Sequence, residues 1–76
     1  MKIKNAEIRQ VHALFMAHSL NIVPKCFMSN FEINHLRDDQ LVEAISNHAV
    51  AIASEMLLSW LEDNHIDLET DLIEEN

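Results

Sequence analysis

Glycine is absent from this chain of 76 residues, and proline occurs only once. Average usage of about 7% would give roughly five glycines in a chain of this length. Turns that need a positive φ must therefore use asparagine, which tolerates that conformation better than most residues. We expect Asn21, Asn30, Asn34 and Asn64 to carry the chain reversals, because they lie between the predicted elements.

Cysteine also occurs only once, as Cys26. A single cysteine excludes an internal disulfide, and with it the framework of a small disulfide-rich secreted protein. No zinc-finger spacing is present either. Because no base is placed beside it in the sequence, Cys26 is more typical of a small buried hydrophobic residue than of a catalytic nucleophile.

Long hydrophobic runs are lacking as well. The longest mostly apolar stretch, residues 49–61, has 13 residues and contains Ser54, Glu55 and Ser59. A transmembrane helix needs about 20 predominantly apolar residues. The N-terminus leads directly into a polar, charged segment, which argues against a signal peptide. We therefore expect a soluble, cytoplasmic protein that does not act at a membrane.

Positive charge is scarce. The chain contains five Lys and Arg residues and thirteen Asp and Glu residues, which gives a net charge of −8. Residues 1–30 carry four basic and one acidic side chain, whereas residues 31–76 carry one basic and twelve acidic ones. Because this second half repels polyanions, we expect no direct binding to nucleic acid. A protein partner with a basic surface fits the charge better.

The length predicts one small domain over residues 1–76, near the lower limit at which a single core is stable. Disulfides, a structural metal or oligomerisation usually stabilise domains of this size. The 49% hydrophobic content is too high for a chain that is disordered overall. Residues 66–76 are predicted to form an acidic tail, and a frayed end is one of the alternatives for it.

The longest predicted element is a helix over residues 38–63, a stretch without proline or glycine that would extend about 39 Å. Asp38 is expected to cap it, with Asp39 adding favourable negative charge to its first turn. The first half of this helix has one apolar and one polar face. From Val50 onward, apolar residues also occupy the side that is polar two turns earlier. This half therefore needs cover from two directions, and a second subunit would supply one.

A shorter amphipathic helix is predicted over residues 6–20, capped by Asn5 and ended before Pro24. Its apolar arc includes Leu14 and, unexpectedly, His18. Residues 25–36 are predicted to be irregular or to include a short helix, because Ser29 to Glu32 matches a capping box. Short extended pieces fit this region equally well.

Residues 66–72 alternate between apolar and polar side chains, which is typical of a strand. A short helix capped by Asp67 fits almost as well, as does a frayed end. The sequence as a whole favours an all-α fold, a small helical hairpin or bundle that dimerises. The alternative is an α+β fold with short strands near residues 25–33 and 66–72.

Two surfaces are candidates for function. The first is an apolar stripe that predicts a dimer interface or a docking face, formed by Val50, Leu57, Leu58, Trp60 and Leu61. The second is acidic and lies within residues 62–76, where seven carboxylates occur without a basic residue: Glu62, Asp63, Asp67, Glu69, Asp71, Glu74 and Glu75. Such a run keeps a protein soluble, and it also provides a docking surface for a basic partner.

No catalytic motif or cofactor-binding signature is found, and we predict neither catalytic residues nor a metal or cofactor. Five histidines invite a metal hypothesis, but His12 and His18 point to different sides of one helix. We therefore expect a non-enzymatic interaction module, a regulator or inhibitor that acts as an acidic homodimer on a basic partner. The alternative is an inhibitor that mimics nucleic acid, of the kind found in phages and mobile elements. A histidine-based metal-binding protein is less favoured.

Overall fold

The computed structural model describes residues 2–73, and within that range it contains four helices and two very short strands. A mostly helical fold was predicted and is confirmed. In chain order the elements are β1 (Ile3–Lys4), α1 (Asn5–Cys26), α2 (Asn30–His35), α3 (Asp38–Asp63), α4 (Leu68–Asp71) and β2 (Leu72–Ile73).

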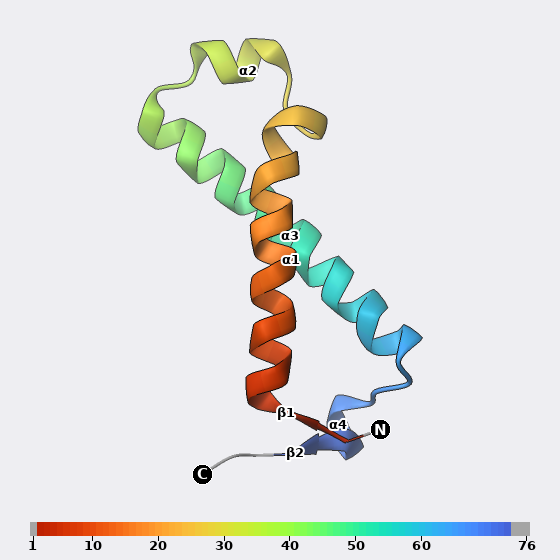
Figure 1. Cartoon of the computed structure of the whole chain (residues 1–76). Coiled ribbons are helices and arrows are strands. Elements are labelled where there is room, and N and C mark those ends of the chain that lie inside the picture. Colours follow the sequence, from red (N-terminus) through yellow and green to blue (C-terminus); the bar gives the residue numbers. More distant parts are fainter. Residues whose placement is uncertain (1, 74–76) are drawn as a thin grey trace.

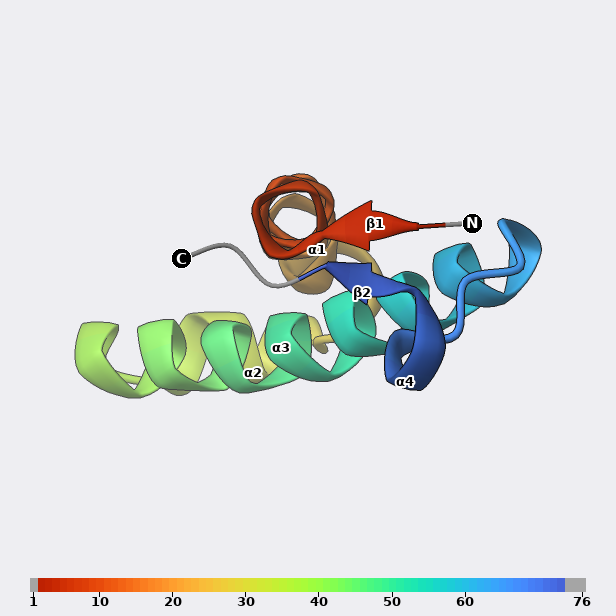
Figure 2. The ribbon, with the colours of Figure 1, turned by 90° about the horizontal axis from the view of Figure 1, so that it is seen from below.

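The fold consists of two long helices, α1 and α3, which run in opposite senses and cross obliquely (Figure 1). Figure 2 shows α1 with β1 in one layer and α3 with α4 in the other. Small residues form the crossing: Ser19 of α1 and Ala49 and Ala53 of α3 are all fully buried. The Ser19 hydroxyl donates a hydrogen bond to the sulfur of Met56, at 3.8 Å. Small side chains allow the two backbones to approach closely.

The buried side of α1 coincides only in part with the predicted one: Ile8, Val11 and Phe15 of the predicted apolar arc are half-buried. Leu14 is 70% exposed and His18 is exposed, although both belong to the apolar arc of the sequence. Ser19 and Val23 are fully buried instead. The helix is turned because the crossing requires a small residue against the alanines of α3, and periodicity of hydrophobic residues does not reveal that requirement.

Helix α1 also ends later than predicted, at Cys26, with Pro24 inside its last turn. A proline there removes only one backbone N–H group, and the carbonyl of Val23 still accepts from Phe27 N–H at 2.9 Å. Burial of Val23 against Met28 and Ala49 holds this turn in place. Cys26 is exposed rather than buried, because it lies at the end of α1, beyond the crossing with α3.

The capping box at the start of α2 is confirmed. The Ser29 hydroxyl accepts from the backbone N–H of Glu32 at 3.1 Å, and the Glu32 carboxylate accepts from the Ser29 N–H at 3.3 Å. Residues 25–33 therefore form the end of α1, a turn and the start of α2. The alternative of a strand in this region was wrong.

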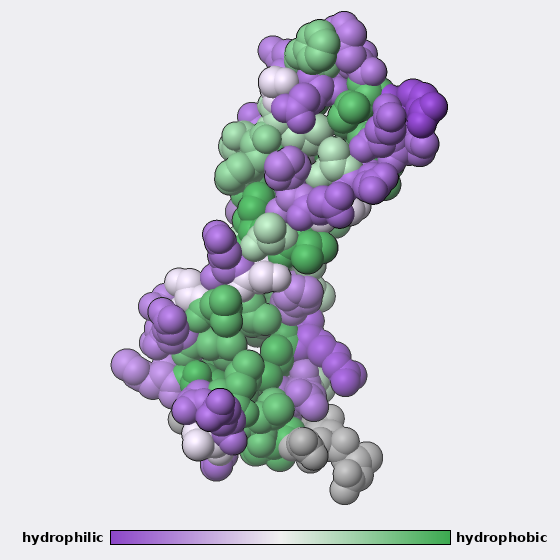
Figure 3. Space-filling model, turned by 180° about the vertical axis from the view of Figure 1, so that it is seen from behind, coloured by the Kyte–Doolittle hydropathy of each residue, from purple (hydrophilic) through white to green (hydrophobic). Residues whose placement is uncertain are grey.

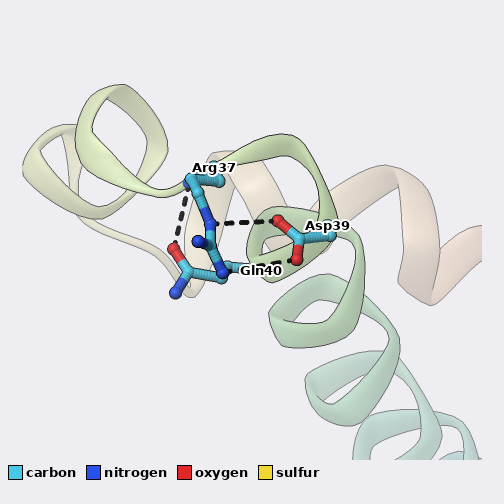
Figure 4. Close-up of polar contacts among 3 residues, drawn as sticks. All are labelled: Arg37, Asp39 and Gln40. Carbon is cyan, nitrogen blue, oxygen red and sulfur yellow. Dashed lines mark hydrogen bonds and ion pairs between the residues drawn. The ribbon is translucent and has the colours of Figure 1, made fainter.

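Helix α3 has the predicted bounds, but its N-cap is Arg37 and not Asp38. The side-chain oxygen of Gln40 accepts from the backbone N–H of Arg37 at 3.1 Å, so a glutamine satisfies the N–H group of the N-cap residue (Figure 4). The Arg37 Nε lies 3.4 Å from Asp39 Oδ1 (Figure 4). Both side chains are highly exposed, so this ion pair contributes little stability.

The C-terminus of α3 ends in a Schellman motif. The Ile66 N–H donates to Leu61 C=O at 2.9 Å, and the His65 N–H donates to Glu62 C=O at 3.1 Å. His65, with φ 55°, is the one residue in the described range that has a positive φ. The expectation that asparagines would take this conformation was wrong, because Asn64 is the C-cap with φ −96°. The buried contact between Ile66 and Leu61 completes the motif.

The two ends of the described chain meet in a parallel pair of strands, with Ile3 opposite Leu72 and Lys4 opposite Ile73. The sequence predicted no strand at the N-terminus. Of the region near 66–72, only Leu72 belongs to a strand, and the alternative of a short helix capped by Asp67 is confirmed as α4. The acidic tail is paired with the N-terminus as far as Ile73, and residues 74–76 lie outside the described range.

Two small cores lie on opposite sides of the crossing. The first contains Ile3, Leu61 and Ile66, with Ile8, Leu57 and Trp60 packed around them. The second contains Val23, Met28 and Ala49, surrounded by partly buried side chains of α1, α2 and α3. The radius of gyration is 15.5 Å, whereas a compact domain of this length has about 11 Å. The molecule is thus flat and extended, with principal extents of 46 × 26 × 16 Å.

Candidate functional site

The chain exposes more surface than a compact monomer of its size. Its accessible surface is 5653 Å², whereas about 4,770 Å² is typical of a monomer of 8.8 kDa. Seen from behind, apolar side chains gather over the lower half of the molecule (Figure 3). Among residues 2–73, nine large apolar side chains are exposed: Leu14, Leu20, Phe27, Phe31, Val42, Val50, Leu58, Leu68 and Ile73.

The predicted apolar stripe divides into an exposed and a buried part. Val50 is 52% and Leu58 60% exposed, and Leu57 lies half-buried beside them. At 100° per residue these three side chains fall within one 100° arc of α3, which we call the outer stripe. Leu61, by contrast, is 4% exposed and packs against Ile3 and Ile66. The prediction that Leu61 belongs to the interface is therefore corrected, because β1 and the segment after α3 cover this side chain.

Helix α3 as a whole is long and apolar enough to cross a membrane by length and composition. It has 26 residues, and an 18-residue window in it has a mean hydropathy of 1.3. The core helix of a soluble protein meets the same criterion, but such a helix is mostly buried. In α3, only 11% of this window is buried inside the structure. Much of α3 is therefore without cover in the single chain.

A pocket of about 420 Å³ opens between α1 and α3, on the other side of α3 from the outer stripe. It is lined by Phe15, Glu55, Met56, Ser59, Trp60 and Asp63. Glu55, Ser59 and Asp63 follow one another at intervals of four residues, so they form a polar ridge along α3. The two carboxylates are separated by eight residues, or about 12 Å along the helix axis.

The sequence reasoning missed most of this pocket. Trp60 and Asp63 were assigned to two different surfaces, the apolar stripe and the acidic run. The four-residue spacing of Glu55, Ser59 and Asp63 is readable in the sequence and could have indicated the ridge. Phe15 could not have been assigned, because only the crossing of the helices places it opposite Trp60.

The acidic surface is partly used by the fold. Asp67 caps α4, with its carboxylate accepting from Glu69 N–H at 2.9 Å. Asp71 accepts from Asp67 N–H, also at 2.9 Å. Lys2 of the N-terminus donates to the Thr70 carbonyl at 2.6 Å and so brings positive charge to this region. Glu62, Asp63 and Glu69 are exposed, and Glu74 and Glu75 lie outside the described residues.

Comparison with protein-family models, with curated proteins and with solved structures finds no match for this chain.

The histidines and the cysteine are not gathered into a cluster. Within residues 2–73, no three His, Cys, Asp or Glu side chains lie close enough to hold one metal ion. His35 stacks on Phe31 with ring centroids 4.1 Å apart, and its Nδ1 lies 2.9 Å from the Phe31 carbonyl. The outer stripe and the pocket are thus the features with a shape suited to recognition.

The hydrogen bond from Asp67 N–H lowers the pKa of Asp71 from its usual 3.8, and the charge of Lys2 acts in the same direction. A lowered pKa means that the folded C-terminal segment is favoured above pH 3.8 and loses this support as the pH falls below it. In an NMR titration, we expect the signal of the Asp71 side-chain carboxyl carbon to follow a step with its midpoint below 3.8. The variant Asp71→Asn removes that step, whereas Glu69→Gln retains it. A midpoint at or above 3.8 would contradict the assignment.

Proposed function

We propose that the protein is a non-enzymatic interaction module that works as a homodimer and presents an acidic surface to a basic protein partner. The surplus of exposed surface is the observation that carries this proposal. It amounts to about 880 Å² relative to a compact monomer. A stable interface of standard size buries about 800 Å² on each partner. One interface between two copies therefore accounts for the surplus.

The outer stripe is the part of α3 best suited to a second copy. A two-fold interface brings the same patch of both subunits together, so an apolar helix face is complementary to itself. Between residues 44 and 61, Glu55 is the only Asp, Glu, Lys or Arg, and it lies on the pocket side. Two chains of net charge −8 can therefore meet along Val50 and Leu58 without placing like charges in contact.

The acidic surface supports the second part of the proposal. Residues 31–76 have a net charge of −11, and Glu62, Asp63 and Glu69 are exposed. Such a field attracts a basic partner and accelerates its association. The alternative is that the protein mimics nucleic acid and occupies a nucleic-acid-binding site of its partner. Competition between duplex DNA and this protein for the same partner would indicate that alternative.

Replacement of Leu58 by glutamate is expected to weaken the dimer at least tenfold, because it places two carboxylates in the apolar interface. Sedimentation equilibrium at protein concentrations of about 1–200 µM, a range that suits a micromolar Kd, would measure the change in dimer affinity. Far-UV circular dichroism would confirm that the helices persist. The matched control is Leu14→Glu, an exposed leucine on α1 outside the outer stripe, which should leave dimerisation unchanged.

Two results would overturn the dimer. One is a wild-type protein that stays monomeric across the whole concentration range. The other is flotation of the wild-type protein with phosphatidylcholine vesicles in a manner that Leu58→Glu abolishes, since the outer stripe would then meet lipid instead of a second copy.

A further inference from the structure

We infer that the pocket between α1 and α3 binds an extended segment of the basic partner. This segment carries an apolar residue with one arginine on each side of it. This inference rests on the proposed function, because it specifies how the acidic surface recognises its partner. The volume of about 420 Å³ lies within the range of roughly 300–1,000 Å³ that is typical of ligand pockets.

The pocket has one apolar and one acidic wall. Phe15 from α1 and Met56 and Trp60 from α3 form the apolar wall, and all three are half-buried. Glu55 and Asp63 stand at the two ends of the ridge on the other side, with Ser59 between them. None of the lining residues is basic. A ligand that fills this pocket must therefore be apolar in its middle and positively charged at its ends.

Arginine suits both walls better than lysine. Its planar guanidinium group pairs with a carboxylate through two parallel hydrogen bonds, and it also stacks on aromatic rings. Trp60 provides the ring with the most favourable cation–π interaction, and Asp63 lies three residues further along the same helix. A guanidinium group at this end of the pocket can contact both.

The spacing of the carboxylates determines the spacing of the arginines. Glu55 and Asp63 are separated by about 12 Å along the axis of α3. In an extended chain, residues i and i+4 are about 13 Å apart, and residues i, i+2 and i+4 point to the same side. The matching segment is therefore Arg-x-Leu-x-Arg, whose leucine lies against Met56 and Phe15.

The pocket and the outer stripe occupy different sides of α3. The pocket residues of α3 fall within an arc centred roughly 170° from Val50, Leu57 and Leu58 at 100° per residue. Dimerisation through the outer stripe therefore leaves the pocket of each subunit open, and the dimer offers two equivalent binding sites. Peptide binding and dimerisation can thus be tested separately.

The fluorescence of Trp60 provides the test, because it is the only tryptophan in the chain and it lines the pocket. A peptide with the sequence Arg-Ala-Leu-Ala-Arg, blocked at both ends, is titrated into the full-length protein at low salt. The same peptide with citrulline in place of both arginines keeps the shape and removes the charge. We expect the arginine peptide to change the emission of Trp60 and to bind at least tenfold more tightly than the citrulline peptide.

Charge variants distinguish the pocket from the general acidity of the surface. Glu55→Gln and Asp63→Asn should each weaken the arginine peptide about threefold, and together about tenfold, the range expected for exposed ion pairs. The controls are Glu62→Gln, which removes the charge adjacent to Asp63 but outside the pocket, and Glu43→Gln on the first half of α3. Both should bind the peptide like the wild type.

Equal affinity for the two peptides would overturn the inference, and so would a loss in Glu62→Gln as large as that in Asp63→Asn. Repeating the titration with monomeric Leu58→Glu separates this inference from the proposed dimer. Binding by that variant supports the pocket whether or not the wild-type protein dimerises.

Discussion

Replacing Ala49 by leucine is expected to lower the free energy of unfolding by about 1–3 kcal/mol or more, because it inserts three extra carbon atoms into a fully buried contact between α1 and α3. Ala49 is fully buried and packs against Val23 of α1. The larger side chain can be accommodated only if the two helices move apart, and that movement would also expose Ser19 and Ala53. A domain of this size has little stability to lose. In thermal denaturation each kcal/mol corresponds to a fall in Tm of about 4–8 °C.

The matched control is Ala17→Leu, which makes the same substitution at an exposed position of α1, away from the outer stripe. It should change Tm by less than a few degrees, since surface substitutions are usually within about 0.5 kcal/mol of neutral. Both variants are compared at one protein concentration, so that the comparison does not depend on the oligomeric state. A Tm for Ala49→Leu that equals that of Ala17→Leu would refute the close crossing.

Leu61→Ala is expected to have the other large effect, a loss of about 2–5 kcal/mol in the free energy of unfolding. Leu61 is the centre of the smaller core, where it contacts Ile3 from the N-terminus and Ile66 from the segment after α3. Its carbonyl also accepts the hydrogen bond that closes the Schellman motif. Removing the side chain leaves a cavity beside Ile3 and Ile66, and so it loosens the packing of β1 and of the segment after α3.

Urea denaturation would measure the loss, and hydrogen exchange would locate it. Protection should fall in β1, Ile66 and α4 before it falls at the crossing of α1 and α3. Leu14→Ala serves as the control, since Leu14 is 70% exposed and its truncation should cost little. A loss of less than about 1 kcal/mol for Leu61→Ala, within the range of ordinary surface changes, would show that Leu61 is not a core residue.

Much of the local structure follows from local signals. The bounds of α3 were predictable because residues 38–63 contain no helix breaker, and α2 was predictable because its capping box satisfies two backbone groups within four residues. The prediction of an acidic, mostly helical chain required no knowledge of tertiary contacts. Errors occurred where a local rule met a tertiary constraint, as at Pro24, which the burial of Val23 keeps inside α1.

The candidate sites were predictable only in part. The exposure of Val50 and Leu58 was predictable, because helical periodicity places apolar residues on more than one side of α3. Leu61 was assigned to the same surface because its cover, Ile3, lies 58 positions away in the sequence and only the parallel pairing of β1 with β2 brings it near. The pocket was missed for the same reason, since it depends on Phe15 of α1.

The sequence by itself determined the helices, the negative charge of the C-terminal half and the excess of apolar residues in α3, because these depend on composition and on spacings of three or four residues. Tertiary structure decided which apolar residues are covered. The crossing at Ser19, Ala49 and Ala53 fixes the rotation of both helices, and the pairing of the chain ends buries Leu61 while it leaves Leu58 exposed. Both depend on contacts between distant parts of the chain, and periodicity within one helix carries no information about them.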